Sequence, residues 1–212
     1  MTTQPITIYG DIISGNCHKV AFVARRCGVP FRWTETSVVR KETRAPEFLA
    51  LSPAGQVPIV VLSDGRVLAQ SNAIMLYLAE GSDLIPTDAY DRAQMMQWLF
   101  WEQYSHEKAI AVRRFQLHEL KKSESEIDPS LAGQCQAVLT LMNNHLAKHA
   151  YFVAGRLTLA DIALVAYTRF SHQAGFPLTA WPQVARWVER VLGDLGPLDL
   201  GNGKIIDTSS GG

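Results

Sequence analysis

Four short segments of the sequence carry residue types that could do chemistry, and the first is Ser14-Gly15-Asn16-Cys17. Its spacing is similar to the C-x-x-C motif of dithiol exchange, with Ser14 at the position of the exposed nucleophile. A hydroxyl there could donate a hydrogen bond to a ligand thiolate, or it could simply cap the helix that follows. Cys17 would lie inside the first helical turn, where a cysteine is commonly buried and inert.

The second segment is Val57-Pro58, at the head of a predicted buried strand. A proline at a strand start supplies no ladder donor, and an ordinary trans bond is one reading of it. In the other reading a cis bond turns the Val57 N–H and C=O outward. Those groups could then pair with a peptide-like ligand as an added strand.

The third segment, Gln70-Ser71-Asn72, opens a predicted helix. Ser and Asn at such a position are common caps. The same free N–H groups, at the positive end of the helix dipole, could instead accept an α-carboxylate. The Ser71 hydroxyl would add a donor, and Gln70 could bond an α-amino group.

The fourth segment, Thr158-Leu159-Ala160-Asp161, reads as a capping box, and we assign it to folding alone. His18 and His106 share no metal-ligand spacing with another His, Cys or carboxylate, so no metal site is predicted.

The elements that must position these segments form two groups. Residues 6–80 predict the order β-α-β-α-β-β-α from their alternating and helical periodicities. Strand signals then vanish, and the remainder predicts helices over 88–122, 129–149, 158–174 and 182–192. We therefore expect domains at 1–81 and 87–200, followed by a loose Gly- and Ser-rich tail at 201–212.

Composition narrows the function classes. Lys plus Arg and Asp plus Glu each number 20, so the net charge is zero, which disfavours nucleic acid or an anionic membrane as the main partner. No apolar run approaches a membrane span. Three cysteines, an odd number without zinc spacing, indicate reduced thiols and a cytoplasmic location.

Three motifs in order resemble the cytosolic glutathione transferase family of the bacterial, serine- or theta-like type. They are Ala45–Pro58 (APEFLALSPAGQVP), Leu68–Ile74 (LAQSNAI) and Leu157–Ala163 (LTLADIA). The resemblance covers nearly the whole chain, from about Ile6 to Leu192. It implies an α/β thioredoxin-like first domain, an all-helical second domain, glutathione as co-substrate and a homodimer.

The resemblance also implies roles for particular residues. Ser14 would stabilise the glutathione thiolate, and Val57, before a cis Pro58, would pair with the cysteinyl backbone. Gln70 and Ser71 would hold the γ-glutamyl end. Gln56 and Thr43 would lie near the glycyl carboxylate, with Lys41 or Arg44 as neighbours that could substitute. Phe100, Tyr104 and Lys108 are candidates for the second-substrate site by their helical spacing, and Tyr104 is the one we retain.

Departures from the family pattern leave alternatives open. Gln70 stands where an acidic residue is usual, so a charge pairing with the ligand amino group is lost. Asn16, Cys17 or the backbone alone could activate the thiol in place of Ser14. We expect conjugation of glutathione to small apolar electrophiles. The alternatives are glutathione-dependent reduction of disulfides or peroxides, and a non-catalytic binding module of the same fold.

Overall fold

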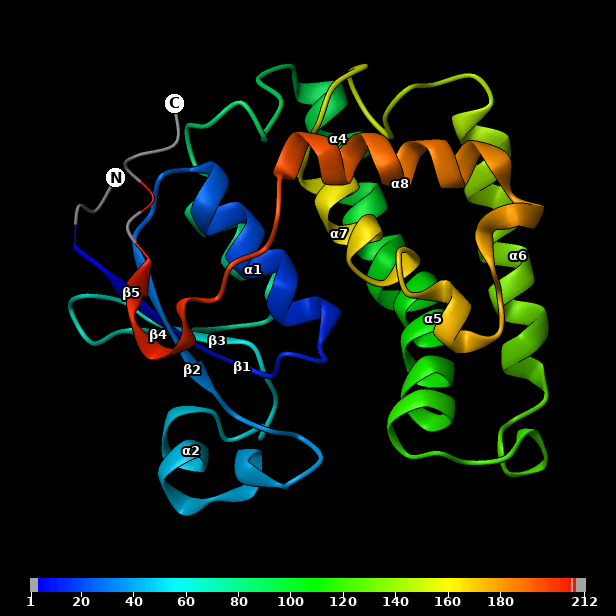
Figure 1. The fold of residues 1–212 in the computed structure, drawn as a ribbon. Coiled ribbons are helices and arrows are strands. Elements are labelled where there is room, and N and C mark those ends of the chain that lie inside the picture. The colour runs from blue at the N-terminus through cyan, green and yellow to red at the C-terminus, as the bar shows by residue number, and fades with distance from the viewer. Residues whose placement is uncertain (1–3, 207, 209–212) are drawn as a thin grey trace. The chain divides into compact units, whose positions relative to one another are not determined.

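The computed structural model describes residues 4–206 and 208. The chain divides into two compact units, one formed by residues up to Ser82 together with those from Pro197, and the other by Asp83–Gly196. We call them the sheet unit and the helical unit (Figure 1).

A mixed five-stranded sheet in the order β4-β3-β1-β2-β5 organises the sheet unit (Figure 1). The strands are β1 (Ile6–Gly10), β2 (Phe31–Glu35), β3 (Ile59–Val61), β4 (Val67–Ala69) and β5 (Ile205–Ile206). β1 and β2 run parallel, and the other neighbouring pairs are antiparallel. The β-branched Ile6 and Ile8 alternate with less buried residues along β1, so one face of this strand enters the core.

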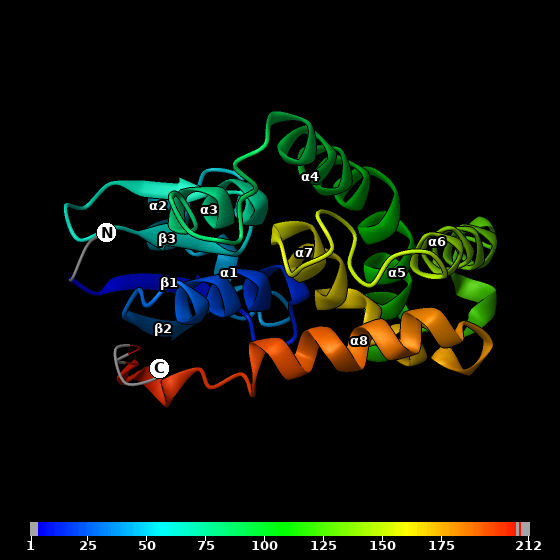
Figure 2. The ribbon, with the colours of Figure 1, turned by 90° about the horizontal axis from the view of Figure 1, so that it is seen from above.

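Three helices complete the sheet unit: α1 (Gly15–Arg26), α2 (Pro46–Leu51) and α3 (Ser71–Leu78). α1 packs against β1 and α3, and α3 packs against β3 (Figure 2). Val20, Val23 and Ala24 of α1, predicted to share a face, are all fully buried. Phe48 of α2 meets Tyr9 of β1 edge to face, with 6.2 Å between ring centroids. The predicted order β-α-β-α-β-β-α is thereby confirmed.

The end of the chain differs from the loose tail predicted over 201–212. Ile205 and Ile206 pair with Arg32 and Phe31 of β2 and close that edge of the sheet. A 3-10 turn at Gly201–Gly203 precedes this strand. Two adjacent isoleucines suit the edge of a sheet, but so short a run gives no periodic signal within a Gly-rich context. The part of the predicted tail at 207 and 209–212 lies outside the described residues.

The helical unit contains α4 (Ala89–Trp101), α5 (Glu107–Arg114), α6 (Ser130–Leu146), α7 (Leu159–Thr168) and α8 (Pro182–Leu195). The predicted helix over 88–122 is interrupted by π-helical turns at Glu102–His106 and Phe115–Glu119. α7 is buried at every residue and packs against α4, α5 and α8, so it forms the centre of this unit (Figure 1).

Asp161 fixes the start of α7, as the capping-box motif predicts. Its Oδ2 accepts from the N–H and the hydroxyl of Thr158, and its Oδ1 accepts from the Phe152 N–H and the Trp187 indole. All four distances are 3.0 Å. The carboxylate therefore joins three segments of the helical unit and has a folding role. None of the helices in the described part of the chain has the length and apolar character needed to cross a membrane.

Candidate functional site

Strand register gathers the predicted site residues at one end of the sheet. Ile59 of β3 lies opposite Tyr9 of β1 and Ala69 of β4. Because β3 is antiparallel to both strands, the residues just before Ile59 lie where β1 and β4 end. β2 runs parallel to β1 and ends at this edge too, with Glu35 opposite Gly10. The loops after β1 and β2, the segment before β3 and the start of α3 therefore meet there.

Ser14 caps the N-terminus of α1 at this end of the sheet. Its backbone is extended, and its Oγ accepts from the Cys17 N–H at 3.4 Å. A serine hydroxyl accepts and donates at the same time, so its own proton remains available to a ligand. The positive end of the α1 dipole favours negative charge at this position.

Cys17, the last residue of the S-x-x-C segment, is fully buried. The backbone N–H of Asp11 donates to its Sγ at 3.4 Å. Burial raises the pKa of the Cys17 thiol to about 12, against a smaller lowering by the Ser14 hydroxyl. The thiol is therefore neutral at physiological pH, and it has the inert character expected of a cysteine inside a first helical turn.

The first turns of α1 and α3 are tied together by side chains. The Ser71 hydroxyl donates to the Asn16 carboxamide oxygen at 3.1 Å. Gln70 precedes Ser71 with a φ of 70°, a left-handed backbone conformation that favours glycine, while its side chain is exposed. This conformation turns the chain sharply from β4 into α3, and it brings the N-terminal end of α3 to the edge where α1 begins.

Val57 offers unpaired backbone groups at the same edge. The Val57–Pro58 bond is cis, as the family resemblance implies. Within the described residues, no hydrogen bond uses the N–H or the C=O of Val57. The N–H and the C=O of Val57 are therefore available beside β3. An extended peptide that adds to a sheet as a strand pairs with backbone groups of this kind.

Asp11 positions the loops around the site, a role that the sequence analysis missed. Its carboxylate accepts from the Ile13 N–H at 3.1 Å and from the Val38 N–H at 2.7 Å, so it joins the loop after β1 to the loop after β2. Asp11 is 2% exposed. The signal available in the sequence was an acidic residue directly after a strand that ends in Gly10.

The loop after β2 continues to Thr43, which is buried in the short 3-10 helix Glu42–Arg44. This helix lies against the segment that leads to Val57. A Cβ built on Gly55 would stand 3.0 Å from the Thr43 carbonyl oxygen, and the Arg44 guanidinium donates to the Ala54 carbonyl at 3.4 Å. Thr43 and the exposed Gln56 therefore lie on neighbouring stretches of chain.

We call this cluster the sheet-end site. It consists of six residues that the sequence analysis singled out: Ser14, Thr43, Gln56, Val57, Gln70 and Ser71. Tyr104, the seventh, belongs to the helical unit, on the π-helical turn after α4, where 82% of it is exposed. Phe100 of α4 is 67% exposed.

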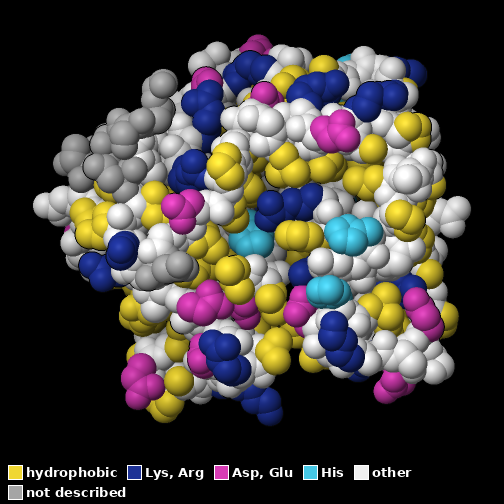
Figure 3. All heavy atoms as spheres, viewed as in Figure 1, with side chains coloured by type: hydrophobic (Ala, Val, Ile, Leu, Met, Phe, Trp, Pro, Cys, Tyr) yellow, Lys and Arg dark blue, Asp and Glu magenta, His cyan; other side chains and the backbone are white. Residues whose placement is uncertain are grey.

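The electrostatic surroundings do not indicate a metal centre. Within residues 4–206 and 208, no group of three or more His, Cys, Asp or Glu side chains could hold a metal ion. Acidic and basic side chains are interspersed with hydrophobic ones on the face displayed in Figure 3. Polar chemistry at the sheet-end site would depend on hydroxyl, amide and backbone groups and on the two helix ends.

Two family models match the chain, one in each unit. The family model for the glutathione S-transferase N-terminal domain matches residues 13–80, which include Ser14, Val57 and Ser71. The model for the glutathione S-transferase C-terminal domain matches residues 95–194. The two together span most of both units.

Individual relatives cover the chain nearly end to end. Glutathione S-transferase 3 from Zea mays is 31% identical over 199 residues, which are 88% of this chain and 89% of the relative. A glutathione S-transferase structure from Xanthobacter autotrophicus Py2 is 42% identical, with a TM-score of 0.85, and the match covers 92% of this chain and 95% of that one. A glutathione S-transferase structure from Pseudomonas fluorescens Pf-5 is 37% identical, also with a TM-score of 0.85, and covers 88% and 94%.

The thioredoxin-like mixed sheet followed by a helical unit, the motifs at the sheet end, and relatives that match along both units lead to one assignment. This chain is an enzyme of the glutathione S-transferase family.

Proposed function

We propose that this transferase binds glutathione at the sheet-end site and conjugates it to small apolar electrophiles. The observation that carries the proposal is the meeting of the α1 and α3 N-termini, tied by Ser71 and Asn16, beside the unpaired backbone of Val57. Glutathione is a tripeptide with a thiol between two carboxylate ends. It therefore needs a strand-like backbone partner, a thiolate donor and anion donors, and the site offers each of them.

Each part of the tripeptide has a partner in this proposal. The cysteinyl backbone pairs with the N–H and C=O of Val57. The γ-glutamyl carboxylate accepts from the Ser71 N–H at the start of α3, where the helix dipole favours an anion. The Gln70 carboxamide oxygen accepts from the α-amino group. Gln56 and Thr43 bind the glycyl end, with Lys41 or Arg44 able to substitute.

Ser14 would activate the thiol by stabilising its anion. A free thiol with a pKa near 8.5 is only a few per cent ionised at neutral pH. Lowering the pKa by about two units requires about 2.7 kcal/mol of differential stabilisation. One hydrogen bond to a charged acceptor is worth about 1.5–3 kcal/mol, and the α1 dipole adds to it.

The reaction then follows from the thiolate. The thiol loses its proton to solvent, and the sulfur lone pair forms a bond to an electrophilic carbon. In an aryl halide, the carbon–halogen bond breaks and the halide leaves with the bonding electrons. The Ser14 hydroxyl hydrogen-bonds the sulfur while it carries charge, which is the role that hydroxyl and backbone donors play at developing anions in other enzymes.

The surroundings of Ser14 favour it over the alternatives. The Cys17 thiol is buried and its pKa is about 12, so it supplies neither a thiolate nor a charged donor. The Asn16 carboxamide oxygen accepts from Ser71. The same burial of Cys17 weighs against disulfide or peroxide reduction through this thiol, since such chemistry needs an accessible thiolate.

The second substrate would contact the helical unit. We propose Tyr104 as part of its site, because the ring is 82% exposed and would offer apolar surface with a polar tip.

We also propose that the protein is a cytoplasmic homodimer with a role in detoxification. The three cysteines are free, which suits a reducing compartment. Light scattering after size-exclusion chromatography tests the dimer.

A crystal structure with glutathione, paired with calorimetry, tests the proposed site. We expect a micromolar to millimolar dissociation constant, with the peptide along Val57 and its sulfur within hydrogen-bond reach of the Ser14 Oγ. Absence of binding, or a sulfur placed away from the start of α1, would contradict the proposal. Turnover of an aryl halide that exceeds turnover of a glutathionyl disulfide separates conjugation from reduction.

A further inference from the structure

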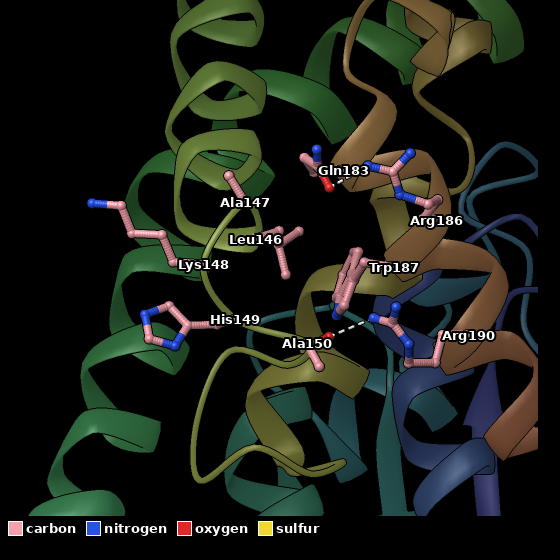
Figure 4. A pocket seen from close by; sticks show the side chains of 9 residues that line it. All are labelled: Leu146, Ala147, Lys148, His149, Ala150, Gln183, Arg186, Trp187 and Arg190. Atoms are coloured by element: carbon pink, nitrogen blue, oxygen red, sulfur yellow. Dashed lines mark hydrogen bonds between the residues drawn. The ribbon is translucent and has the colours of Figure 1, made fainter.

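A cavity lies entirely within the helical unit, between the end of α6 and residues 183–190 of α8 (Figure 4). Its volume is about 240 Å³. It is lined by Leu146, Ala147, Lys148, His149, Ala150, Gln183, Arg186, Trp187 and Arg190. This volume is below the usual range for drug-sized ligands, so an occupant would be small.

Two guanidinium groups of α8 reach into this cavity. Arg186 and Arg190 lie one helical turn apart, and Figure 4 shows Arg190 turned toward Ala150 and Arg186 turned toward Gln183. Arg190 donates to the Ala150 carbonyl at 2.7 Å, and Arg186 donates to the Gln183 side chain. An arginine carries five N–H donors, so most donors of each guanidinium remain for a ligand.

No carboxylate balances these two charges inside the cavity. The residues that line it include neither Asp nor Glu. Within the described chain, no salt bridge involves Arg186 or Arg190. Asp194, one turn beyond Arg190, accepts instead from the Tyr151 hydroxyl at 2.7 Å. In a chain with equal numbers of acidic and basic residues, this is a local excess of positive charge.

The opposite wall adds uncommitted backbone donors. The chain leaves α6 after Leu146, and no hydrogen bond among the described residues uses the N–H of His149 or Ala150. The Lys148 side chain extends away from the two guanidinium groups in Figure 4. The wall that faces α8 is therefore formed by backbone together with Leu146, Ala147 and Ala150, and the cavity beside the arginines has room for a small anion.

From this arrangement we propose that the cavity between α6 and α8 binds a small phosphate dianion through Arg186 and Arg190. Guanidinium forks match phosphate oxygens in bidentate geometry, and two forks can share one tetrahedral anion. A monocarboxylate has oxygens for only one fork, so it should bind more weakly. The ligand is either free phosphate or the phosphate group of a small monoester, since both present the same chemistry.

Backbone amide NMR of the full-length protein, titrated at constant ionic strength, tests this proposal. The probes are inorganic phosphate, glycerol 3-phosphate and acetate, with sodium chloride adjusted to hold ionic strength. We expect saturable shifts confined to residues 147–150 and 183–190 for the two phosphates. Tighter binding of the monoester would identify a phosphorylated small molecule as the ligand, and equal or tighter binding of phosphate would identify the free ion.

Arg186→Gln is the clean variant, because among the described residues the Arg186 guanidinium donates only to the Gln183 side chain, and no bond to a backbone group is lost. It should weaken phosphate binding about tenfold, as expected for the loss of a charge-assisted hydrogen bond. Lys148→Gln changes the net charge equally but removes an outward-facing side chain, so it should weaken binding less than about twofold. Arg190→Gln serves as the second site variant.

Two results would overturn the proposal. One is the absence of saturable shifts in these segments at tens of millimolar phosphate. The other is an equal loss of affinity in Arg186→Gln and Lys148→Gln, because that would reduce the effect to general electrostatics. Unchanged amide spectra of the unliganded variants establish that they are folded, and the outcome is then read from the titrations alone.

Discussion

The hydroxyl of Ser71 donates a hydrogen bond to the carboxamide oxygen of Asn16 across 3.1 Å, and so joins the first turn of α3 to the first turn of α1. The two residues are 55 positions apart in the sequence. Because the single hydroxyl proton of Ser71 is used in this bond, Ser71 offers a ligand its backbone N–H and its oxygen lone pairs. The bond thus holds two helix N-termini, and their dipoles, beside one another.

Replacing Ser71 and Asn16 with Ala, singly and together, should reveal this coupling. We expect each single change to lower the free energy of unfolding, with a coupling energy of about 0.5–1.5 kcal/mol, the usual worth of one hydrogen bond. Urea unfolding followed by circular dichroism measures the three variants. If the losses in free energy of unfolding of the two single variants add up to that of the double variant, the hydrogen bond contributes no coupling between the two helices.

The same Ser71 and Asn16 variants should also bind glutathione more weakly. If the bond aligns the two helix ends for glutathione, Asn16→Ala should weaken glutathione binding although Asn16 itself need not touch the ligand. We expect a loss of about tenfold for Ser71→Ala, which removes a site residue, and a smaller loss for Asn16→Ala. Calorimetry at one pH and ionic strength gives both values. Unchanged affinity in Asn16→Ala would limit its role to stability.

Ser14→Ala should move the pH dependence of the reaction. Without the hydroxyl, the pKa of bound glutathione rises toward that of the free thiol. Activity with an aryl halide should then fall about tenfold to a hundredfold at neutral pH and recover as pH increases, since each unit of pKa is a factor of ten in thiolate. The measurement is kcat/KM between pH 5.5 and 9. An unshifted profile removes Ser14 from thiolate stabilisation.

Cys17→Ala is the matched control for Ser14→Ala in the same helical turn. The Cys17 thiol is buried and its pKa is about 12, so it contributes no charge to the reaction. Its removal should lower stability, because the Asp11 N–H loses its partner and a small cavity forms. The pH profile of activity should stay in place. A displaced profile would assign the activating role to Cys17.

The local signals in the sequence predicted the elements well. The turn at Asp64-Gly65, the punctuation at Gly28 and Pro30, and the Thr158–Asp161 capping box each act over a few residues, and each has the expected structure. The periodicity of residues 88–122 predicted a helix but not its π-helical turns. Such a turn inserts one residue into a helical repeat, and the periodicity of apolar residues alone does not predict where this insertion occurs.

The long-range contacts could not be predicted from the sequence. The Ser71–Asn16 bond and the bridge from Asp11 to Val38 join residues 55 and 27 positions apart. Neither is visible until the sheet register brings those loops to one edge. The pairing of Ile205 with Arg32 is a third example, because a run of two residues is too short for its periodicity to predict a strand. Gln56, Val57, Gln70 and Ser71 could be proposed from the sequence because the family motifs that contain them carry tertiary information that periodicity lacks.

His145 should make the helical unit less stable in mild acid. Its ring stacks between His149 and Phe152, and a ring nitrogen lies 3.2 Å from the Phe152 carbonyl oxygen. Burial, and then the charge of His149, lower the pKa of His145 below its ordinary value of 6.5. The unfolded chain therefore takes up the proton more readily, so the stabilising contribution is complete above pH 6.5 and is lost as pH falls below it.

A comparison of unfolding free energies at pH 7.5 and 5.5 measures this effect. His145→Gln cannot titrate, so it should lose less stability between the two pH values than the unmodified protein does. His172→Gln removes an exposed imidazole and should keep the unmodified pH dependence. Identical pH dependence in the unmodified protein and His145→Gln would show that the stacked ring titrates as it does in the unfolded chain.

Asp161→Asn tests how strictly the start of α7 needs a carboxylate. All four groups around Asp161 are donors: two backbone N–H groups, the Thr158 hydroxyl and the Trp187 indole. An asparagine keeps the shape but turns an NH₂ toward two of these donors, in a site that is fully buried. Two hydrogen bonds are lost, and their donors stay buried without acceptors. We expect a loss of about 3 kcal/mol or more at pH 7.5.

Thr158→Ala provides the scale for that loss. It removes one of the four donors and leaves the carboxylate with its other three partners, so it should cost about 1 kcal/mol, as for other N-cap residues. Asp161 lies in the helical unit, and glutathione affinity at the sheet-end site should be unchanged in variants that remain folded. Equal losses in Asp161→Asn and Thr158→Ala would mean that the capping hydroxyl, and not the carboxylate that joins three segments, carries the stability of this helix start.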